Sequence, residues 1–123
     1  MKLEFPVLRH AWDGLLHVVR TQRHARWHAL VSLVVVVLGI GLQVSRLEWL
    51  ALILAMGLVW CAEIFNTAIE IACDVISKDP HPLIGLAKDV AAGAVLVAAV
   101  AAAAVGAVVF VPRLWGMWKF LGE

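Results

Sequence analysis

Hydrophobic and polar positions along the chain follow helical spacing, beginning with a stretch at about residues 7–22. Apolar residues recur there every three or four positions, opposite charged ones, and the apolar side carries Trp12. This pattern predicts an amphipathic helix. Because a long apolar run follows at once, it is typical of a helix that lies in the headgroup region of a membrane. A helix packed against a protein partner is the alternative interpretation.

Three longer apolar runs follow, each close to or above the roughly 20 residues that an α-helix needs to cross a bilayer. A loop at about residues 77–85 contains Pro80 and Pro82 and separates the second run from the third. The third run is uncharged from Val90 to Val111 and rich in small residues, which lets helices approach closely in lipid. The sequence therefore predicts an all-α membrane protein formed by a single domain over residues 1–123. Its transmembrane helices are expected at about residues 27–44, 48–76 and 86–111.

The composition agrees with a membrane location. Of the 123 residues, 63% are hydrophobic and 15% are charged, and the mean hydropathy is +0.94. A soluble domain would carry roughly twice that density of charge, so the composition excludes a secreted or cytosolic globular protein. The net charge of +1 and the absence of a basic run with interleaved aromatic residues argue against nucleic acid as a partner.

Basic residues indicate how the helices cross the membrane. Five Lys or Arg residues precede the first predicted span, and two more lie between the second and third spans. Only three lie on the other side. Because short cytoplasmic loops carry the excess of Lys and Arg, this distribution predicts a multi-pass protein with a cytoplasmic N-terminus. The end of the second span and the loop after it are then also cytoplasmic.

The second predicted span changes character at Glu63. Three carboxylates and an amide follow within an otherwise apolar helix: Glu63, Asn66, Glu70 and Asp74. On an α-helix these four side chains share an arc of roughly 80°. A charged residue within a membrane helix costs about 2.5 to 3.5 kcal/mol on insertion scales, so this face is expected to line a protein interior or cavity and to have a function there. A helix that leaves the membrane near Glu63, with a solvated acidic face, is the alternative.

The spacing of the two glutamates points to separate roles. Glu63 and Glu70 lie two turns apart, about 10.5 Å along the axis, so one can bind a hard cation such as Mg²⁺ while the other acts as a base. Mg²⁺ commonly takes one or two carboxylates and completes its shell with water and substrate phosphate. Lys88 can pair with phosphate oxygens, although a lysine at a membrane boundary is also a common anchor. The sequence has no GxxxxGK[ST] motif, which excludes a P-loop nucleotide site.

One part of the sequence resembles the signature of a known family. The second span reads E-I-F-N-T-A-I-E-I-A-C-D from Glu63 to Asp74, followed by H-P-L at His81 and A-K-D at residues 87–89. This order and spacing resemble those of the small prokaryotic integral-membrane lipid kinases, the diacylglycerol kinases and undecaprenol kinases. Ala11–Leu15 is similar to the family's interfacial helix, and Arg26–His28 to the start of its first span. The resemblance therefore covers nearly the whole chain.

The resemblance implies a homotrimer of three-span subunits with sites between neighbours, located in the bacterial inner (plasma) membrane. The implied activity transfers the γ-phosphoryl group of ATP to a lipid hydroxyl at the cytoplasmic face, with Mg²⁺ as cofactor. By position, Glu63 would be the catalytic base, Asn66 would support the base and the substrate, and Asp74 would organise the site. The cofactor-binding residues would be Gln22, Glu70, Asp79, His81, Lys88 and Asp89, of which Glu70 and Gln22 would bind the metal.

Gln22 departs from the family pattern, which has a glutamate at this position among the metal ligands. Glutamine offers Mg²⁺ a neutral carbonyl oxygen but no charge, so the metal affinity should fall. An active kinase is the favoured interpretation. The alternatives are a weakened kinase, a kinase whose second metal ligand comes from elsewhere, and a non-catalytic assembly partner. A small oligomeric cation or drug transporter is the alternative from another class, since an acidic stripe can bind cations. The residues around His81 and Lys88 favour undecaprenol over diacylglycerol as the lipid.

Overall fold

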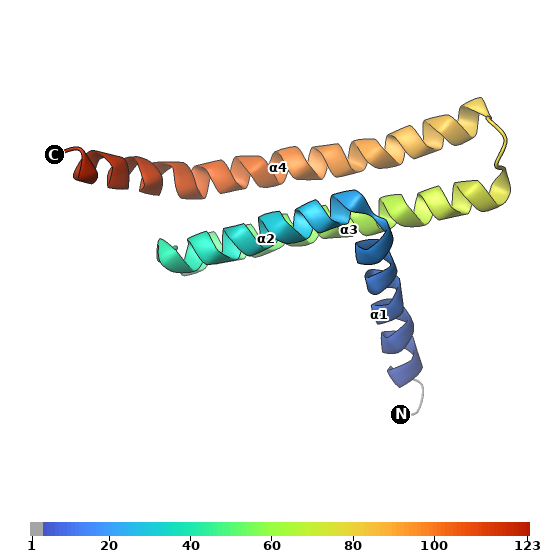
Figure 1. Ribbon diagram of the computed structural model, residues 1–123, viewed down its shortest axis with the longest axis horizontal. Helices are drawn as coiled ribbons and strands as arrows, with labels where there is room; N and C mark the ends of the chain where they lie inside the picture. The colour runs from blue at the N-terminus through green and yellow to red at the C-terminus, as the bar shows by residue number, and fades with distance from the viewer. Residues whose placement is uncertain (1–3) are drawn as a thin grey trace.

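The computed structural model describes residues 4–123 as four α-helices joined by short connections (Figure 1). Three of these helices are long and apolar enough to cross a membrane. The prediction of an all-helical chain with three helices of spanning length is therefore confirmed. The helices are α1 (Glu4–Thr21), α2 (Arg23–Gly41), α3 (Arg46–Ile76) and α4 (Pro82–Leu121).

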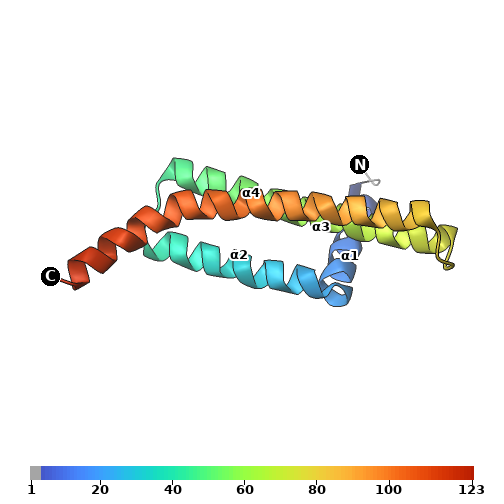
Figure 2. The ribbon, with the colours of Figure 1, turned by 90° about the horizontal axis from the view of Figure 1, so that it is seen from above.

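Helices α3 and α4 form an antiparallel hairpin that is closed by an ion pair near each end (Figure 2). At one end, Lys88 Nζ lies 2.6 Å from Asp74 Oδ1. At the other end, two guanidinium nitrogens of Arg113 contact the two carboxylate oxygens of Glu48, at 2.8 and 3.2 Å. At 1.5 Å per residue, the pairs are separated by about 39 Å along α3 and about 38 Å along α4. The two helices therefore stay in register over this whole distance.

Local side-chain contacts define where α3 and α4 begin. Ser45 Oγ accepts a hydrogen bond from the Glu48 main-chain N–H at 3.2 Å, and Glu48 Oε2 accepts one from the Ser45 N–H at 3.1 Å. This capping box satisfies two N–H groups that a helix start leaves unpaired. At α4, His81 Nδ1 accepts from the Leu83 N–H at 3.2 Å. Helix α4 begins at Pro82, because the first helical position tolerates a residue without an N–H. The loop between α3 and α4 is therefore shorter than the one predicted at about residues 77–85.

The described hydrophobic core lies at the end of the hairpin that carries the Glu48–Arg113 pair. It is formed by Val44, Leu52, Val109 and Phe110, with partly buried residues of α2 packed against them. Most other large apolar side chains of the three long helices are exposed in the single chain. Such faces are expected where lipid or other subunits cover a membrane helix.

Gly39 in α2 is buried against the indole ring of Trp49 in α3. A Cβ atom added at Gly39 would lie 2.5 Å from Trp49 Cη2. Gly39→Ala is therefore expected to lower the free energy of unfolding by about 1 to 3 kcal/mol, because the ring must move in a packed region. Thermal or denaturant unfolding in detergent micelles, followed by circular dichroism, measures the change.

Gly41→Ala is the matched control for this prediction. Gly41 lies in the last turn of the same helix, and no atom comes within 4 Å of an added Cβ. Alanine in an open helical position is neutral or stabilising. Equal stabilities of the two variants would contradict the close contact between Gly39 and Trp49.

Helix α1 runs across the direction of the other helices and joins α2 at Gln22 (Figure 1). Its extent matches the helix expected at about residues 7–22. At the opposite end of the chain, α4 continues through Pro112 to Leu121, well beyond the span expected to end at 111. Figure 2 shows these last turns of α4 bending from the axis of the rest of the helix and extending beyond the ends of α2 and α3. Proline inside a helix removes one hydrogen bond and bends the axis without always ending the helix.

Candidate active site

Glu63 lies in the middle of α3 and is buried, with 3% of its surface exposed. Its Oε2 atom is 3.7 Å from Nε2 of His28 on α2. This separation is too long for a hydrogen bond, but a hydroxyl oxygen can lie within hydrogen-bonding distance of both atoms. No other described side chain contacts the Glu63 carboxylate through a hydrogen bond or ion pair. The carboxylate is therefore available to accept a proton from a hydroxyl group.

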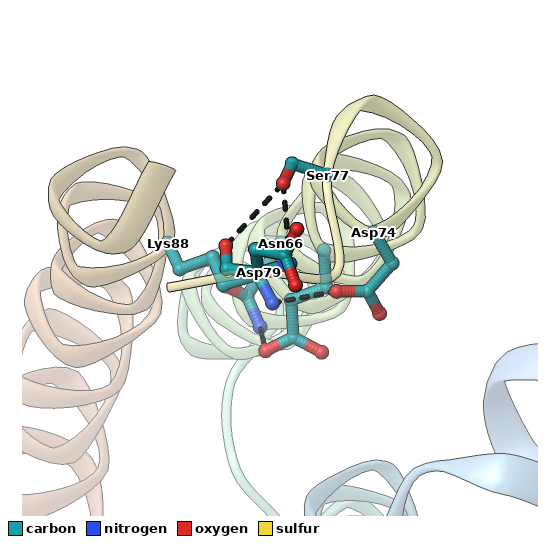
Figure 3. A network of polar contacts seen from close by, with 6 residues as sticks. Asn66, Asp74, Ser77, Asp79 and Lys88 are labelled. Carbon is teal, nitrogen blue, oxygen red and sulfur yellow. Dashed lines mark hydrogen bonds and ion pairs between the residues drawn. The ribbon is translucent and has the colours of Figure 1, made fainter. Parts of the chain in front are cut away.

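Asn66 lies about one turn beyond Glu63 and is also buried. Its Nδ2 donates a hydrogen bond to Oε1 of Glu70 at 3.5 Å, and Figure 3 shows it among the polar side chains at this end of the hairpin. Its Oδ1 atom is buried and has no hydrogen-bond partner among the described residues. Because an unpaired buried acceptor is costly, this atom marks a position where a ligand or a neighbouring chain is expected.

Contacts between α2 and α3 place Gln22 relative to the acidic stripe. His28 faces Glu63, and a hydrogen bond between Ser32 and Trp60 lies one turn further along, so the two helices are antiparallel. Gln22 comes six residues before His28, about 9 Å along the axis. Glu70 comes seven residues after Glu63, about 10.5 Å in the same direction. Gln22 and Glu70 therefore lie at nearly the same level along the helices.

The turn between α3 and α4 forms an open pocket of about 540 Å³. Four of the predicted site residues line it: Asp74, Asp79, His81 and Lys88. Lys88 is paired with Asp74, so the lysine is held in place across the pocket. Ser77 Oγ accepts from the Asp79 main-chain N–H at 3.1 Å and orders the turn (Figure 3). The pocket thus combines two lysines, Lys78 and Lys88, with exposed carboxylates and the imidazole that caps α4.

The predicted residues fall into two groups along α3. Glu63, Asn66 and Glu70 lie within the helical bundle, whereas Asp74 lies at the pocket in the turn. Eleven residues separate Glu63 from Asp74, about 16 Å along the helix, so only an elongated ligand can reach both groups. Asp89 is exposed, and the described contacts join it to neither group.

The donor atoms near Glu70 are suited to a hard cation. The described residues include no group of three or more His, Cys, Asp or Glu side chains that could hold a metal by themselves. The atoms available as metal ligands are carboxylate and amide oxygens, among them the Asn66 Oδ1 atom that has no hydrogen-bond partner among the described residues. Mg²⁺ prefers such oxygen ligands and keeps several water or phosphate ligands. The oxygen atoms present are therefore of the type that Mg²⁺ binds, and Glu70 supplies the carboxylate among them.

His28 is a site residue that sequence reasoning missed. A lone histidine near the start of a membrane helix reads as an interfacial polar residue, and nothing in its local pattern connects it with Glu63. The short connection between α2 and α3, residues 42–45, indicates only that the two helices are antiparallel neighbours. His28 lies 13 residues before the end of α2 and Glu63 lies 17 residues after the start of α3, so their contact depends on an offset of about one turn that the sequence does not supply.

An apolar groove of about 350 Å³ begins at His28 and extends between α2, α3 and α4 to Phe110. Of the residues that line it, only His28 and Ser32 are polar. Small residues of α4 such as Ala99 and Ala103 form one side and leave the space open. A hydrocarbon chain placed in this groove would have its polar end next to the His28 and Glu63 side chains.

Comparison with known proteins connects this geometry with a family. The family model described as prokaryotic diacylglycerol kinase matches residues 9–110. The chain is 39% identical over 105 residues to the undecaprenol kinase of Bacillus subtilis, covering 85% of each chain. It is 37% identical over 107 residues to a diacylglycerol kinase of Synechocystis, covering 86% of this chain and 61% of that protein. It is 34% identical over 93 residues to the diacylglycerol kinase of Escherichia coli K12, covering 76% of each. The chain belongs to the prokaryotic diacylglycerol kinase family and is a lipid kinase.

Proposed function

We propose that this kinase transfers the γ-phosphoryl group of ATP to the hydroxyl of undecaprenol, with Mg²⁺ as cofactor. The observation that carries the proposal is the buried Glu63 carboxylate, which faces His28 at one end of an apolar groove. A lipid alcohol can place the first part of its chain along the groove and present its hydroxyl to Glu63. Both the family membership and the geometry of the site therefore support an active kinase rather than a transporter.

Glu63 acts as the general base in the proposed reaction. Its carboxylate accepts the hydroxyl proton as the lipid oxygen forms a bond to the γ-phosphorus, and the bond from that phosphorus to the β,γ-bridging oxygen breaks to release ADP. His28 Nε2 lies close enough to bind the same lipid oxygen and hold it beside the carboxylate. Asn66 supports this arrangement one turn further along α3. Phosphoryl transfer depends mainly on such positioning and on charge neutralisation, so few residues suffice.

The nucleotide is proposed to extend from Glu70 to the pocket in the α3–α4 turn. Lys88 can share its charge between Asp74 and a phosphate oxygen, because an ammonium group has three donors. Asp79 and His81 line the same pocket, and Asp89 follows Lys88 on the exposed surface of α4. When bound at Glu70 and Gln22, Mg²⁺ would neutralise phosphate charge and orient the transferred group.

The proposed assembly is a homotrimer with sites between neighbouring subunits. A second groove, of about 570 Å³, lies along α3 and α4 and includes Asn66 together with small residues such as Gly93 and Ala94. Small residues let another helix approach closely in lipid. A donor from a neighbouring chain could then satisfy the unpaired Asn66 Oδ1. This supports an interface that includes a site residue.

The proposed arrangement in the membrane places the site at the cytoplasmic face of the bacterial plasma membrane. The distribution of basic residues supports a cytoplasmic N-terminus. Helix α1 would then lie along the cytoplasmic surface, with exposed side chains such as Leu8 and Trp12 in contact with lipid. The whole chain would form a single domain.

A lipid panel tests the proposed substrate and cofactor. Purified protein in mixed micelles with ATP and MgCl₂ is expected to form ADP only when a lipid alcohol is present, with a higher kcat/KM for undecaprenol than for diacylglycerol. Chelation of Mg²⁺ with EDTA is expected to stop turnover. ADP formation without any lipid alcohol would contradict the proposed phosphoryl transfer. Faster turnover of diacylglycerol would contradict only the choice of lipid.

A further inference from the structure

A cluster of arginines marks the junction between α1 and α2. Arg20, Arg23 and Arg26 are spaced three residues apart across the end of α1 and the first turns of α2. Arg23 and Arg26, together with Trp27 and Leu30, line an open pocket of about 360 Å³. No acidic side chain lines this pocket. It is therefore a positively charged surface with an apolar side.

These arginines differ from the basic residues at the ends of the α3–α4 hairpin. Lys88 and Arg113 each bind a carboxylate of the facing helix. Neither Arg23 nor Arg26 forms an ion pair or a side-chain hydrogen bond with any described residue. The guanidinium donors at the pocket are thus available to an external anion.

The position of the pocket limits the kind of anion that it can bind. Helix α2 is a candidate membrane span, and α1 joins it at the end that carries the pocket and runs across the direction of the bundle (Figure 1). Trp27 and Leu30 are 56% and 50% exposed on the first turns of α2. Tryptophan is typical of the membrane interface, where its ring lies at the level of the headgroups. An anion bound by the arginines would therefore have apolar side chains next to it, on the membrane side.

We infer that this pocket binds the phosphodiester headgroup of an anionic membrane phospholipid. Arg23 and Arg26 would bind the phosphate oxygens, since guanidinium groups match phosphate geometry in a bidentate manner. Trp27 and Leu30 would contact the first carbons of the acyl chains. None of the four residues belongs to the proposed catalytic or metal-binding set, so the site is separate from the one that binds the lipid alcohol. The inference goes beyond the proposed function and does not require it.

Native mass spectrometry of the full-length protein tests the inference. The protein is incubated with dioleoyl phosphatidylglycerol or dioleoyl phosphatidylcholine, without ATP or lipid alcohol. We expect the wild type to bind phosphatidylglycerol more tightly, and this preference to weaken as the salt concentration rises. Each arginine near a membrane surface contributes about fivefold in affinity, so the Arg23→Gln, Arg26→Gln double variant is expected to lose about thirtyfold. The double lysine variant keeps the charge but loses the bidentate guanidinium geometry, so it is expected to bind less tightly than the wild type and more tightly than the double glutamine variant.

Matched controls separate this site from general charge effects. The Arg46→Gln, Lys119→Gln double variant removes the same charge at the opposite end of the helices and is expected to keep the lipid preference. Glu63→Gln is also expected to keep it, so a failure of the proposed catalysis leaves this test intact. Equal binding of the two phospholipids by the wild type would overturn the inference. Equal losses of phosphatidylglycerol affinity in the Arg23/Arg26 and Arg46/Lys119 double variants would also overturn it. Displacement of the phospholipid by an equal concentration of inorganic phosphate would do the same.

Discussion

Replacement of Glu63 with glutamine is expected to reduce kcat by about 100-fold to 10,000-fold, the usual contribution of a general base. The amide has nearly the same shape and can still occupy the buried position, but it cannot accept the proton of the lipid hydroxyl. The KM values for ATP and Mg²⁺ are expected to change little, because Glu63 lies about 10.5 Å along α3 from the proposed metal ligand Glu70 and about 16 Å from Asp74 at the nucleotide pocket. Steady-state assays of ADP formation with the preferred lipid alcohol measure both quantities.

Glu48→Gln is the matched control for the Glu63 variant. Glu48 lies on the same helix and is paired with Arg113 at the far end of the hairpin. Its replacement weakens an ion pair and a helix cap but leaves the site untouched, so kcat should stay close to that of the wild type. If Glu63→Gln retains full turnover, Glu63 is not the base.

Glu70→Gln is expected to lower kcat/KM by at least about 100-fold at low Mg²⁺ and by much less at high Mg²⁺. The variant keeps an acceptor oxygen for Asn66 Nδ2 but removes the negative charge that is proposed to bind Mg²⁺. Loss of a negative ligand weakens a hard-cation site, and even changes beyond the ligands themselves commonly cost 10-fold to 100-fold in metal affinity. Titration of activity against free Mg²⁺ at saturating lipid measures the shift.

Gln22→Glu provides the complementary variant. Because Gln22 and Glu70 lie at nearly the same level, the added carboxylate should lower the Mg²⁺ concentration needed for half-maximal activity by about tenfold. In the Gln22→Glu, Glu70→Gln double variant, the new charge at position 22 should restore part of the Mg²⁺ affinity that Glu70→Gln removes. An unchanged Mg²⁺ response in Gln22→Glu would show that Gln22 is not a metal ligand.

Helix α3 illustrates how much of the fold and site could be predicted from the sequence. Its apolar length predicted a span at about residues 48–76, and the helix runs over Arg46–Ile76. The spacing of the acidic stripe along one helix requires no knowledge of the other helices. For this reason the separation of Glu63 from Glu70, and the separate roles expected for them, could be stated from the sequence alone.

Contacts between helices could not be predicted in the same way. Beyond its first turns, α2 is apolar on nearly all sides, so its sequence contains no information on which residue of α3 lies opposite each position. His28 becomes part of the site only through this register, and Gly39 becomes essential only because Trp49 packs on it. Lys88 likewise reads as a free phosphate ligand or an anchor until the hairpin brings Asp74 to it.

The two ion pairs of the α3–α4 hairpin also indicate how the hairpin fits a bilayer. Their separation of about 38 to 39 Å exceeds the roughly 30 Å of the hydrocarbon core but fits within the 40 to 45 Å that includes the headgroups. Both pairs can therefore lie at the level of the headgroups while the largely apolar segments between them cross the hydrocarbon. Because Asp74 and Lys88 form one of these pairs and also line the pocket in the turn, that pocket would open at the polar surface of the membrane.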